Sequence, residues 1–260
     1  MNLFKISIIT ITYNDLLGLK NTIKSIDKYF HKREVLIDHV IIDGNSIDGT
    51  KEYITELISS RGINTRFISE PDLGIYDAMN KGVSHSDADY VIFINSGDIL
   101  LSGFFEQAVY NKLYNILNQR DSAGLALNCV YDFGWKKVLV RARRVNLWIP
   151  RMPTIHQGII YKRLILLELP YSLVYKICGD FENMCRILKK YKFDILNSNI
   201  AQLTAGGVST LKPFTLAKES YFVFKQHFSP NIFRRIIFLT KISISLSIVR
   251  LMFVFSSNKN

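Results

Sequence analysis

The first hundred residues alternate between strand-like and helix-like patterns, and this alternation constrains the fold more than any other feature. Strand-like apolar runs are expected at 5–12, 35–42, 64–69 and 90–95. Between them, apolar residues recur at helical spacing over 15–30, 48–60 and 74–85. Strands joined by helices form right-handed crossovers. The pattern therefore predicts an α/β fold with a mostly parallel sheet covered on both faces.

Polar residues follow each of these four strands. They are Tyr13-Asn14, Asp43-Gly44, Glu70-Pro71-Asp72 and the stretch from Asn95 to Asp98. In open α/β sheets, ligands bind beyond the carboxyl ends of the strands. We therefore expect these four loops to meet at one edge of the sheet and to form a single binding site.

The second half is less regular. A helix is expected at 104–117 and another at 181–191, with strands at 123–131, 137–140, 155–161 and 193–203. The segment 231–255 is dense in isoleucine, phenylalanine and leucine and reads as a basic helix, although 242–248 also alternates like a strand. Such a helix suits either an anionic membrane surface or packing against protein.

Charge is divided unevenly along the chain. The net charge is +11, with −4 in residues 1–125 and +15 in residues 126–260. This division suggests an acidic pocket followed by a surface that meets anions, and nucleic acid, anionic lipid and diphosphate all fit. The chain contains no recognised DNA- or RNA-binding module, and an acidic edge repels phosphate backbones. We therefore expect no nucleic-acid partner.

Three observations predict a cytoplasmic protein. Tyr13-Asn14-Asp15 stands where a signal peptide would have a small-residue cleavage site. No window reaches the roughly 18 consecutive apolar residues of a membrane-spanning helix. The three cysteines form no CxxC pair and no cluster with histidine, which suits a reducing compartment.

Several acidic residues in these loops suit a nucleotide and its phosphates. Asp43 can accept hydrogen bonds from a base or ribose, or can belong to a plain turn, while Asp48 better suits a helix cap. Asp98 follows a buried strand and suits Mg²⁺ or Mn²⁺ bridging two phosphates, or a helix cap. The string from Glu70 to Gly82, EPDLGIYDAMNKG, gathers acid, amide, base and phenol, and its Lys81 can neutralise phosphate.

These strings together resemble the family 2 glycosyltransferases with the GT-A fold. TYN, DGNSIDGT, EPDLGIYDAMNKG and FINSGD, followed by HQGIIY, GDFE and GGVST, cover about residues 5–210. The similarity is greatest to the subgroup that builds bacterial exopolysaccharides and O-antigens, including the colanic acid type. The resemblance implies a GT-A, Rossmann-like domain over 1–210, with a nucleotide-binding half at 1–100 and an acceptor half at 101–210. A helical, basic extension would follow at 211–260.

The resemblance also assigns roles to individual residues. Asp180 matches the catalytic base, and Asp98 the metal ligand, although Asn95 and Gly97 stand where many relatives have aspartates. Glu182 is the alternative base, and Asp180 could simply cap its helix. The residues expected to bind the nucleotide-sugar are Thr12, Tyr13, Asn14, Asp43, Asp72, Asp77, Asn80, Lys81, His156 and Gly207. For His156 and Gly207, purely structural roles on a strand and in a turn stay open.

The implied reaction moves a sugar, with inversion, from a nucleotide-sugar to a lipid-linked glycan. The expected donor is a UDP-sugar, the expected cofactor Mg²⁺ or Mn²⁺, and the expected acceptor an undecaprenyl-diphosphate-linked saccharide. The protein would lie peripherally on the inner face of the bacterial inner membrane. A non-catalytic protein that binds nucleotide-sugars is the alternative, since two aspartates of the metal motif are replaced.

Overall fold

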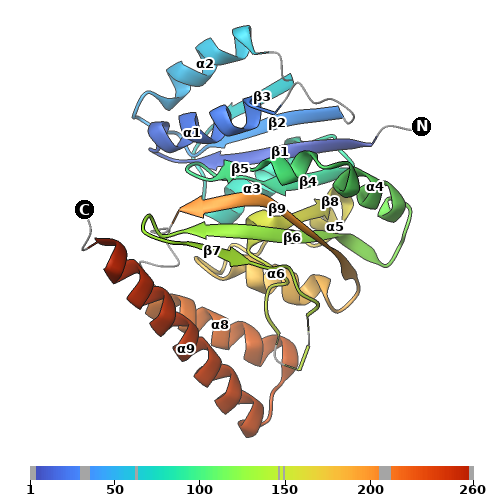
Figure 1. The fold of residues 1–260 in the computed structure, drawn as a ribbon, viewed down its shortest axis with the longest axis vertical. Coiled ribbons are helices and arrows are strands. Elements are labelled where there is room, and N and C mark those ends of the chain that lie inside the picture. Colours follow the sequence, from blue (N-terminus) through green and yellow to red (C-terminus); the bar gives the residue numbers. More distant parts are fainter. Residues whose placement is uncertain are drawn as a thin grey trace.

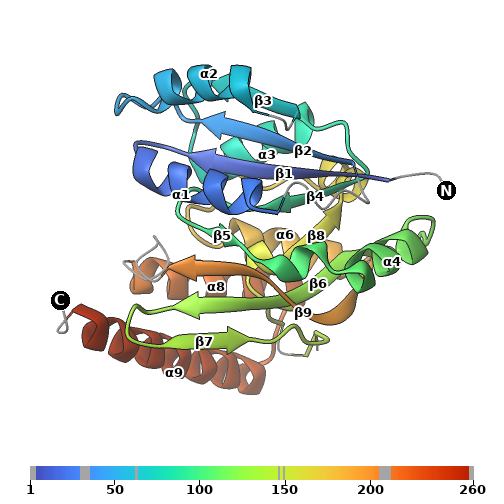
Figure 2. The same ribbon diagram turned by 45° about the horizontal axis from the view of Figure 1, so that its top comes forward.

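The computed structural model describes residues 4–29, 36–61, 64–145, 147–148, 150–204 and 212–257. Across these residues, a nine-stranded sheet forms the centre of the molecule, with helices on both faces. The strand order is β3-β2-β1-β4-β8-β6-β9-β5, and β7 pairs with β6. Figures 1 and 2 show the N-terminal half of the sheet above the C-terminal half.

The N-terminal half is parallel throughout. Its strands are β1 (Lys5–Thr12), β2 (Leu36–Asp43), β3 (Asn64–Ser69) and β4 (Tyr90–Phe93). Its helices are α1 (Leu16–Asp27), α2 (Thr50–Ser60) and α3 (Ile75–His85). These elements match the sequence prediction to within a few residues.

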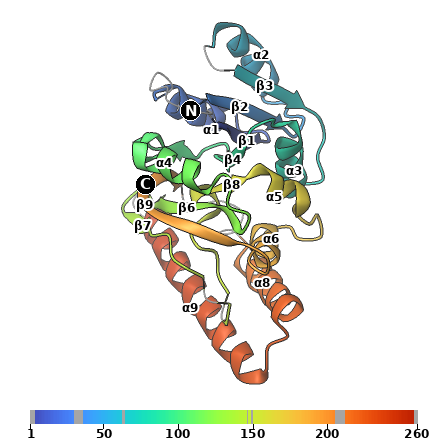
Figure 3. The same cartoon turned by 90° about the vertical axis from the view of Figure 1, so that its right-hand side faces the viewer.

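Alternation along β1 explains why helices cover both faces. Ile8 packs in a cluster with Ile26 of α1, while its neighbour Ile9 packs in another with Met79 and Val83 of α3. Successive strand side chains point to opposite faces, so an unbroken apolar strand requires a partner on each side. Figure 3 shows the sheet between α4 on one side and α3, α5 and α6 on the other.

The C-terminal half is mixed rather than parallel. Its elements are β5 (Ile99–Leu100), η1 (Ser102–Phe105), α4 (Gln107–Ile116), β6 (Ser122–Asp132), β7 (Lys137–Val140), η2 (His156–Gly158), β8 (Ile159–Lys162), α5 (Arg163–Glu168), α6 (Gly179–Ile187) and β9 (Lys192–Thr204). β8 runs antiparallel to both β4 and β6, while β6 and β9 are parallel. The prediction of a parallel sheet is therefore correct for the first four strands, and antiparallel pairs enter at β8.

Two predicted elements are shorter than expected. The strand expected at 155–161 begins with the 3-10 turn η2, and β8 starts only at Ile159. The helix expected at 104–117 is divided into η1 and α4 at Glu106. In both places the apolar run is buried, but it is divided between a 3-10 turn and a helix or strand. Burial alone does not specify backbone conformation.

The C-terminal segment forms a helical hairpin of α8 (Pro213–Phe228) and α9 (Ile232–Ser257). The helix prediction at 231–255 is confirmed, and the strand alternative at 242–248 is not adopted. Phe224 of α8 stacks on Phe238 of α9 with ring centroids 4.1 Å apart. Val223 of α8 packs with Tyr175 and Cys185, so the hairpin rests on the α6 region. None of the helices in the described ranges is long and apolar enough to cross a membrane.

Candidate functional site

The loops after β1 and β2 are joined by hydrogen bonds. The N–H of Asn14 donates to Oγ of Ser46 at 2.7 Å, and Oδ1 of Asn14 accepts from the N–H of Ile47 at 2.9 Å. Beside them, the hydroxyl of Thr12 is buried with no hydrogen-bond partner among the described residues. Tyr13 is 65% exposed. An unsatisfied hydroxyl and an open phenol ring are groups that a bound ligand can use.

Asp43, at the end of β2, is fully buried. Its carboxylate accepts hydrogen bonds from the N–H of Ser46 at 3.1 Å, from the hydroxyl of Ser46 at 2.5 Å and from the hydroxyl of Ser69 at 2.7 Å. These bonds fix the shape of the loop and tie β2 to β3. Direct recognition of a base by Asp43 stays a prediction.

Gly44 brings the second and third loops together. A Cβ placed on Gly44 would lie 2.7 Å from Oδ2 of Asp72 and 3.1 Å from the ring of Tyr13. Oδ1 of Asp72 is held by the N–H of Gly74 at 2.8 Å. A residue larger than glycine at position 44 would therefore displace the Asp72 carboxylate.

Lys81 and Asp77 stabilise the third loop. Nζ of Lys81 lies 2.9 Å from Glu70 and 3.3 Å from Asp77, and it donates to the carbonyl of Pro71 at 2.8 Å. Asp77 also accepts from the N–H of Leu73 at 3.0 Å. The ion pair with Glu70 is the main reason that the pKa of Lys81 is raised. Lys81 is therefore cationic, and its contact with a donor phosphate stays a prediction.

Asn80 is tied to the segment before α6 rather than open to the loops. Its amide nitrogen donates to the carbonyl of Tyr171 at 2.9 Å, and its Oδ1 accepts from the N–H of the same residue at 2.9 Å. Both ends of the amide are occupied, so Asn80 fixes the position of residue 171 against α3.

The fourth loop joins the same edge. Ser96 donates through its hydroxyl to Oδ2 of Asp15 at 2.7 Å and through its N–H to the carbonyl of Ile11 at 3.0 Å. Asp98 is 8% exposed, and Nε2 of Gln157 donates to its Oδ2 at 2.8 Å. Burial raises the pKa of Asp98 to about 7. The polar loops after all four strands therefore lie together.

The turn that carries Asp98 fits a divalent cation. Within the described ranges no three acidic, histidine or cysteine side chains cluster as a metal site. However, Oδ1 of Asn95 in the same turn is buried with no partner among those residues. A buried carboxylate and an unpaired amide oxygen are ligands that Mg²⁺ and Mn²⁺ accept, and Mg²⁺ needs few protein ligands.

His156 lies in an aromatic cluster behind the fourth loop. Its ring is 6% exposed, its Nε2 lies 2.8 Å from the hydroxyl of Tyr171, and Phe93 and Tyr161 pack on it. Burial lowers the pKa of His156 to about 3, so the ring is neutral at pH 7. A charge interaction between His156 and diphosphate is therefore not supported, and the strand position expected for it is a 3-10 turn.

Asp180 stands in the first turn of α6, against α3. Its Oδ1 accepts from the N–H of Phe181 at 2.8 Å and lies 3.4 Å from the hydroxyl of Tyr76. Burial raises the pKa of Asp180 to about 6. A Cβ on Gly179 would lie 2.6 Å from the ring of Tyr76, so only glycine permits this approach. Tyr76 lies in the first turn of α3, directly after the third loop, which places Asp180 at the same edge.

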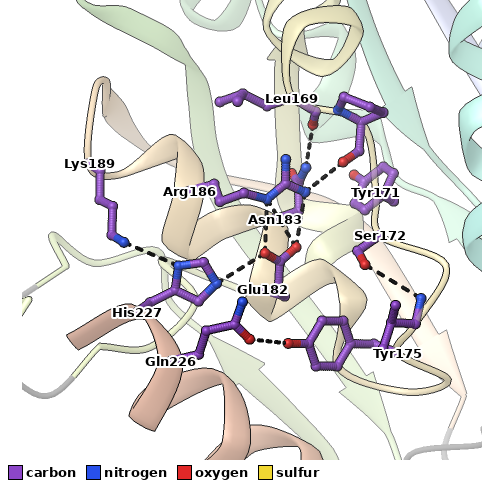
Figure 4. Close-up of polar contacts among 12 residues, drawn as sticks. Leu169, Tyr171, Ser172, Tyr175, Glu182, Asn183, Arg186, Lys189, Gln226 and His227 are labelled. Carbon is purple, nitrogen blue, oxygen red and sulfur yellow. Dashed lines mark hydrogen bonds and ion pairs between the residues drawn. The ribbon is translucent and has the colours of Figure 1, made fainter. Parts of the chain in front are cut away.

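Glu182, the alternative base, is engaged elsewhere (Figure 4). Its carboxylate accepts two bonds from Nε of Arg186, at 2.9 and 3.1 Å, and one from Nη2 at 2.9 Å. Nε2 of His227 on α8 lies 3.0 Å from the same carboxylate. The side chain is 5% exposed. These contacts make Glu182 a structural link between α6 and α8.

One predicted site residue cannot be placed, and two residues that were not predicted contact the proposed site. Gly207 lies outside the described residues. Tyr76 and Gln157 are not among the predicted site residues, although they stand inside the strings EPDLGIYDAMNKG and HQGIIY and contact Asp180 and Asp98. Residue type alone does not reveal such roles, because these contacts join positions about 60 and 100 residues apart in the chain.

Comparison with known proteins points to one family. The model of the family described as glycosyl transferase family 2 matches residues 7–173. A glycosyltransferase of Mycobacterium tuberculosis that is described as uncharacterized is 40% identical over 96 residues, which are 36% of this chain and 34% of the relative. A PGL/p-HBAD biosynthesis glycosyltransferase of Mycobacterium bovis is 24% identical over 55% of each chain. The chain thus matches about a third of the length of the first relative and about half of the length of the second.

Solved structures share the fold at low identity. Staphylococcus aureus TarS 1–349 in complex with UDP-GlcNAc matches with a TM-score of 0.62 and 15% identity, over 92% of this chain and 71% of that one. The mannosyltransferase PcManGT from Pyrobaculum calidifontis, in complex with GDP-Man and Mn²⁺, matches with a TM-score of 0.64 and 12% identity. That match covers 98% of this chain and 74% of the other.

Proposed function

The chain belongs to glycosyl transferase family 2, and from this premise we propose that it transfers a sugar from a nucleotide-sugar to a lipid-linked glycan. One observation carries the proposal: the loops after β1, β2, β3 and β4 and the half-buried Asp180 lie at one edge of the sheet. Ligands of open α/β sheets bind at this edge. The donor is proposed to be a UDP-sugar, as in the complex of TarS with UDP-GlcNAc, with GDP-mannose as the competing class because PcManGT binds GDP-Man.

The nucleotide end of the donor is assigned to the first three loops. The unpaired hydroxyl of Thr12 and the exposed ring of Tyr13 are available to the nucleoside. Asn14, Asp43, Asp72 and Asp77 hold the loops in shape, and Lys81 supplies a cation beside them. A base or ribose can replace the internal partners of these carboxylates on binding.

Asp180 is proposed as the general base. The acceptor hydroxyl oxygen attacks the anomeric carbon of the donor sugar while the bond from that carbon to the diphosphate oxygen breaks. Asp180 takes the hydroxyl proton, and the electron pair leaves with the nucleoside diphosphate. This single displacement inverts the anomeric centre. A carboxylate whose pKa is raised towards neutrality is a better base than an ordinary aspartate.

Asp98 and Oδ1 of Asn95 are proposed to hold Mg²⁺ or Mn²⁺. The bound ion would offset charge on the departing diphosphate. Gln157 orients the Asp98 carboxylate through its hydrogen bond. Position 97, where many relatives have an aspartate, is a glycine with φ of +86°, a conformation that favours glycine.

The acceptor is proposed to be an undecaprenyl-diphosphate-linked saccharide in exopolysaccharide or O-antigen synthesis. The hairpin α8–α9 is the proposed contact with the cytoplasmic face of the inner membrane. On α9, exposed apolar side chains accompany Arg234, Arg235 and Lys241, and its described first turn has no acidic residue. Such a surface suits anionic headgroups without spanning the bilayer.

A nucleotide-sugar panel tests the proposal. Purified protein is mixed with Mn²⁺ and UDP-GlcNAc, UDP-glucose, UDP-galactose or GDP-mannose, and thermal shift and nucleotide release are measured. We expect one donor to raise the melting temperature and to release its nucleotide slowly to water. Stabilisation without release by any donor, also after a short prenyl-diphosphate sugar is added, would favour the non-catalytic binding protein. No stabilisation by any donor would reject both.

A further inference from the structure

The C-terminal helix α8 contacts the segment directly before Asp180. Glu219 of α8 accepts three consecutive backbone N–H groups, from Lys176 at 3.1 Å, Ile177 at 2.9 Å and Cys178 at 2.9 Å. The first bond goes to Oε1 and the other two go to Oε2. One carboxylate thus fixes the backbone of three residues that lie about 40 positions earlier in the chain.

Glu219 satisfies one N–H group that the start of α6 leaves unpaired. The cap residue of α6, Cys178, makes no capping hydrogen bond with its own side chain, and its N–H donates to Glu219. The first turn of α6 itself carries Asp180 and Glu182, and Asp180 accepts from the N–H of Phe181. The bonds from residues 176 and 177 to Glu219 therefore order the segment before the helix, and bonds of N–H to an ionised carboxylate are stronger than neutral ones.

Two further contacts attach α8 to the same segment. The hydroxyl of Tyr175 donates to Oε1 of Gln226 at 2.9 Å (Figure 4). Sγ of Cys178 lies 3.2 Å from the hydroxyl of Ser220. Residues 175–178 are therefore held against α8 along their length, and Asp180 follows two residues later.

We propose that Glu219 is a positioning residue of catalysis, which fixes residues 176–178 so that Asp180 faces Tyr76 and the donor edge. The inference rests on the proposed function, in which Asp180 is the base. It assigns the C-terminal hairpin a part in the reaction in addition to the proposed membrane contact. Positioning matters because a misplacement of about 1 Å can lower the rate about 100-fold.

Glu219 also influences the proton affinity of Asp180. Burial is the main reason that the pKa of Asp180 is raised, and the negative charge of Glu219 raises it further. The other titratable groups whose charges couple to Asp180 are Tyr76, Tyr161, Tyr171, Cys178 and Cys185. Burial raises the pKa of each of these five, so they are neutral near pH 7. These five groups therefore add no charge beside Asp180 near pH 7.

The test compares Glu219→Gln and Glu219→Ala with Glu168→Gln. Glutamine keeps one acceptor oxygen but places an amide donor against a backbone N–H, while alanine removes all three bonds. Glu168 pairs with Lys190 and Tyr191 on the surface and serves as the matched control. The readouts are nucleotide release with the active donor of the panel, donor Kd by calorimetry, and the dependence of kcat/KM on pH.

We expect Glu219→Ala to lower kcat about 10- to 100-fold with donor Kd within about twofold of the wild type. Glu219→Gln should be intermediate, and its acid limb should shift to lower pH, which a purely structural role would not produce. Glu168→Gln should match the wild type in all three measurements.

Three outcomes would overturn the positioning role. These are a kcat of Glu219→Ala within twofold of the wild type, an equal loss of kcat and donor affinity, or an unshifted acid limb in Glu219→Gln. Asp180→Asn, measured in parallel, separates the two hypotheses. An inactive Asp180→Asn beside a fully active Glu219→Ala rejects the inference alone, whereas an active Asp180→Asn rejects the assigned base and the positioning role with it. No turnover with any donor rejects the proposed function itself.

Discussion

The polar side chains at the sheet edge are of two kinds: some hold the loops in shape through hydrogen bonds, and others have a polar atom without a hydrogen-bond partner. Asp43 and Asn80 have their polar atoms engaged by protein groups, as does Glu182, which lies away from this edge between α6 and α8. The hydroxyl of Thr12 and Oδ1 of Asn95 are buried without partners among the described residues. A buried polar atom without a partner costs about 1–3 kcal/mol, which a ligand can recover. The open groups are therefore the better guide to the ligand.

At this scale the first prediction concerns Asp180→Asn. The variant should lower kcat about 100-fold or more and leave donor Kd nearly unchanged, because only proton transfer is lost. Nucleotide release and calorimetry measure the two quantities. Asp121→Asn, on a surface residue paired with Lys192, is the control. An equal fall in donor affinity would make Asp180 a binding residue instead.

The second prediction is the pH dependence of the wild type. The pKa of Asp180 is raised by burial to about 6, and only the deprotonated carboxylate can accept the acceptor proton. With Mn²⁺ at saturation, so that the metal keeps Asp98 ionised, kcat/KM should therefore fall about tenfold per pH unit below pH 6 and level off above it. A limb near pH 4 would contradict the assignment.

The same shift has a consequence for stability. Because the folded pKa of Asp180 lies above its unfolded value, the folded state binds more protons between about pH 4 and 6. The contribution of this group to stability is thus lost as pH rises through that window. Asp180→Asn should melt no lower than the wild type at pH 7.5, which shows that its loss of activity is not unfolding.

The third prediction concerns the metal. EDTA should abolish nucleotide release, and Mn²⁺ should restore it in the wild type but not in Asp98→Ala. Donor binding by Asp98→Ala should no longer respond to Mn²⁺ in calorimetry. Full activity of the wild type in EDTA would remove the metal assignment.

At the scale of elements, α8 is the more closely packed of the two C-terminal helices. It packs on α6 and on the segment before it. α9 packs on α8 and reaches Phe181 of α6 through Phe238, while several of its apolar side chains are exposed: Ile232, Phe233, Ile236, Leu239 and Ile244. Trp148 lies near Phe233 with ring centroids 6.4 Å apart, and Arg234 donates to the carbonyl of Trp148 at 2.7 Å. Trp148 and the first turn of α9 therefore form one surface that carries aromatic and basic groups.

The prediction for this element uses Ile232→Asp combined with Ile236→Asp. These side chains are 70% and 56% exposed and one helical turn apart. The double variant should lose flotation with vesicles containing phosphatidylglycerol and should keep nucleotide release, because two charges oppose burial in the headgroup region. Leu164→Asp, at a 72% exposed position on α5, is the control. Unchanged flotation of the double variant would reject α9 as the membrane contact.

At the scale of the whole molecule, the C-terminal hairpin is joined to α6 and the turn after it through polar contacts around the buried Glu182. Lys189 contacts Nδ1 of His227, whose Nε2 contacts Glu182, and Arg186 contacts Glu182 from the other side (Figure 4). Burial lowers the pKa of His227, so the ring is neutral at pH 7 and donates through Nε2. Residues 182 and 227, which these contacts connect, both lie beyond residue 173, where the family match ends.

We therefore predict that His227→Ala destabilises the whole chain. The variant leaves a buried carboxylate short of one donor, which should lower the free energy of unfolding by about 1–3 kcal/mol. Urea denaturation followed by circular dichroism measures the change. Lys189→Ala, which removes an exposed partner at the end of the same contacts, should cost much less. Equal effects of the two variants would show that the buried link is unimportant.

The sequence by itself determined the N-terminal half of the fold and the edge of the sheet at which we propose that the donor binds. Strand and helix periods are local, and short crossovers leave β1 to β4 few ways to pair except in parallel. Polar loops after such strands must meet at one edge, so the order of strands and loops along the chain is enough to group Asp43, Asp72 and Asp98. The fold class follows from the same periodicity.

Only the tertiary structure decided which of these groups are free to act. The antiparallel entry of β8, the burial of His156 and the engagement of Glu182 depend on contacts between distant segments. The same holds for Tyr76 beside Asp180 and for Glu219 beneath residues 176–178. Such contacts have no period in the sequence. Burial and hydrogen-bond partners, which set whether an ionisable group is charged, neutral or structural, arise only when the chain is packed.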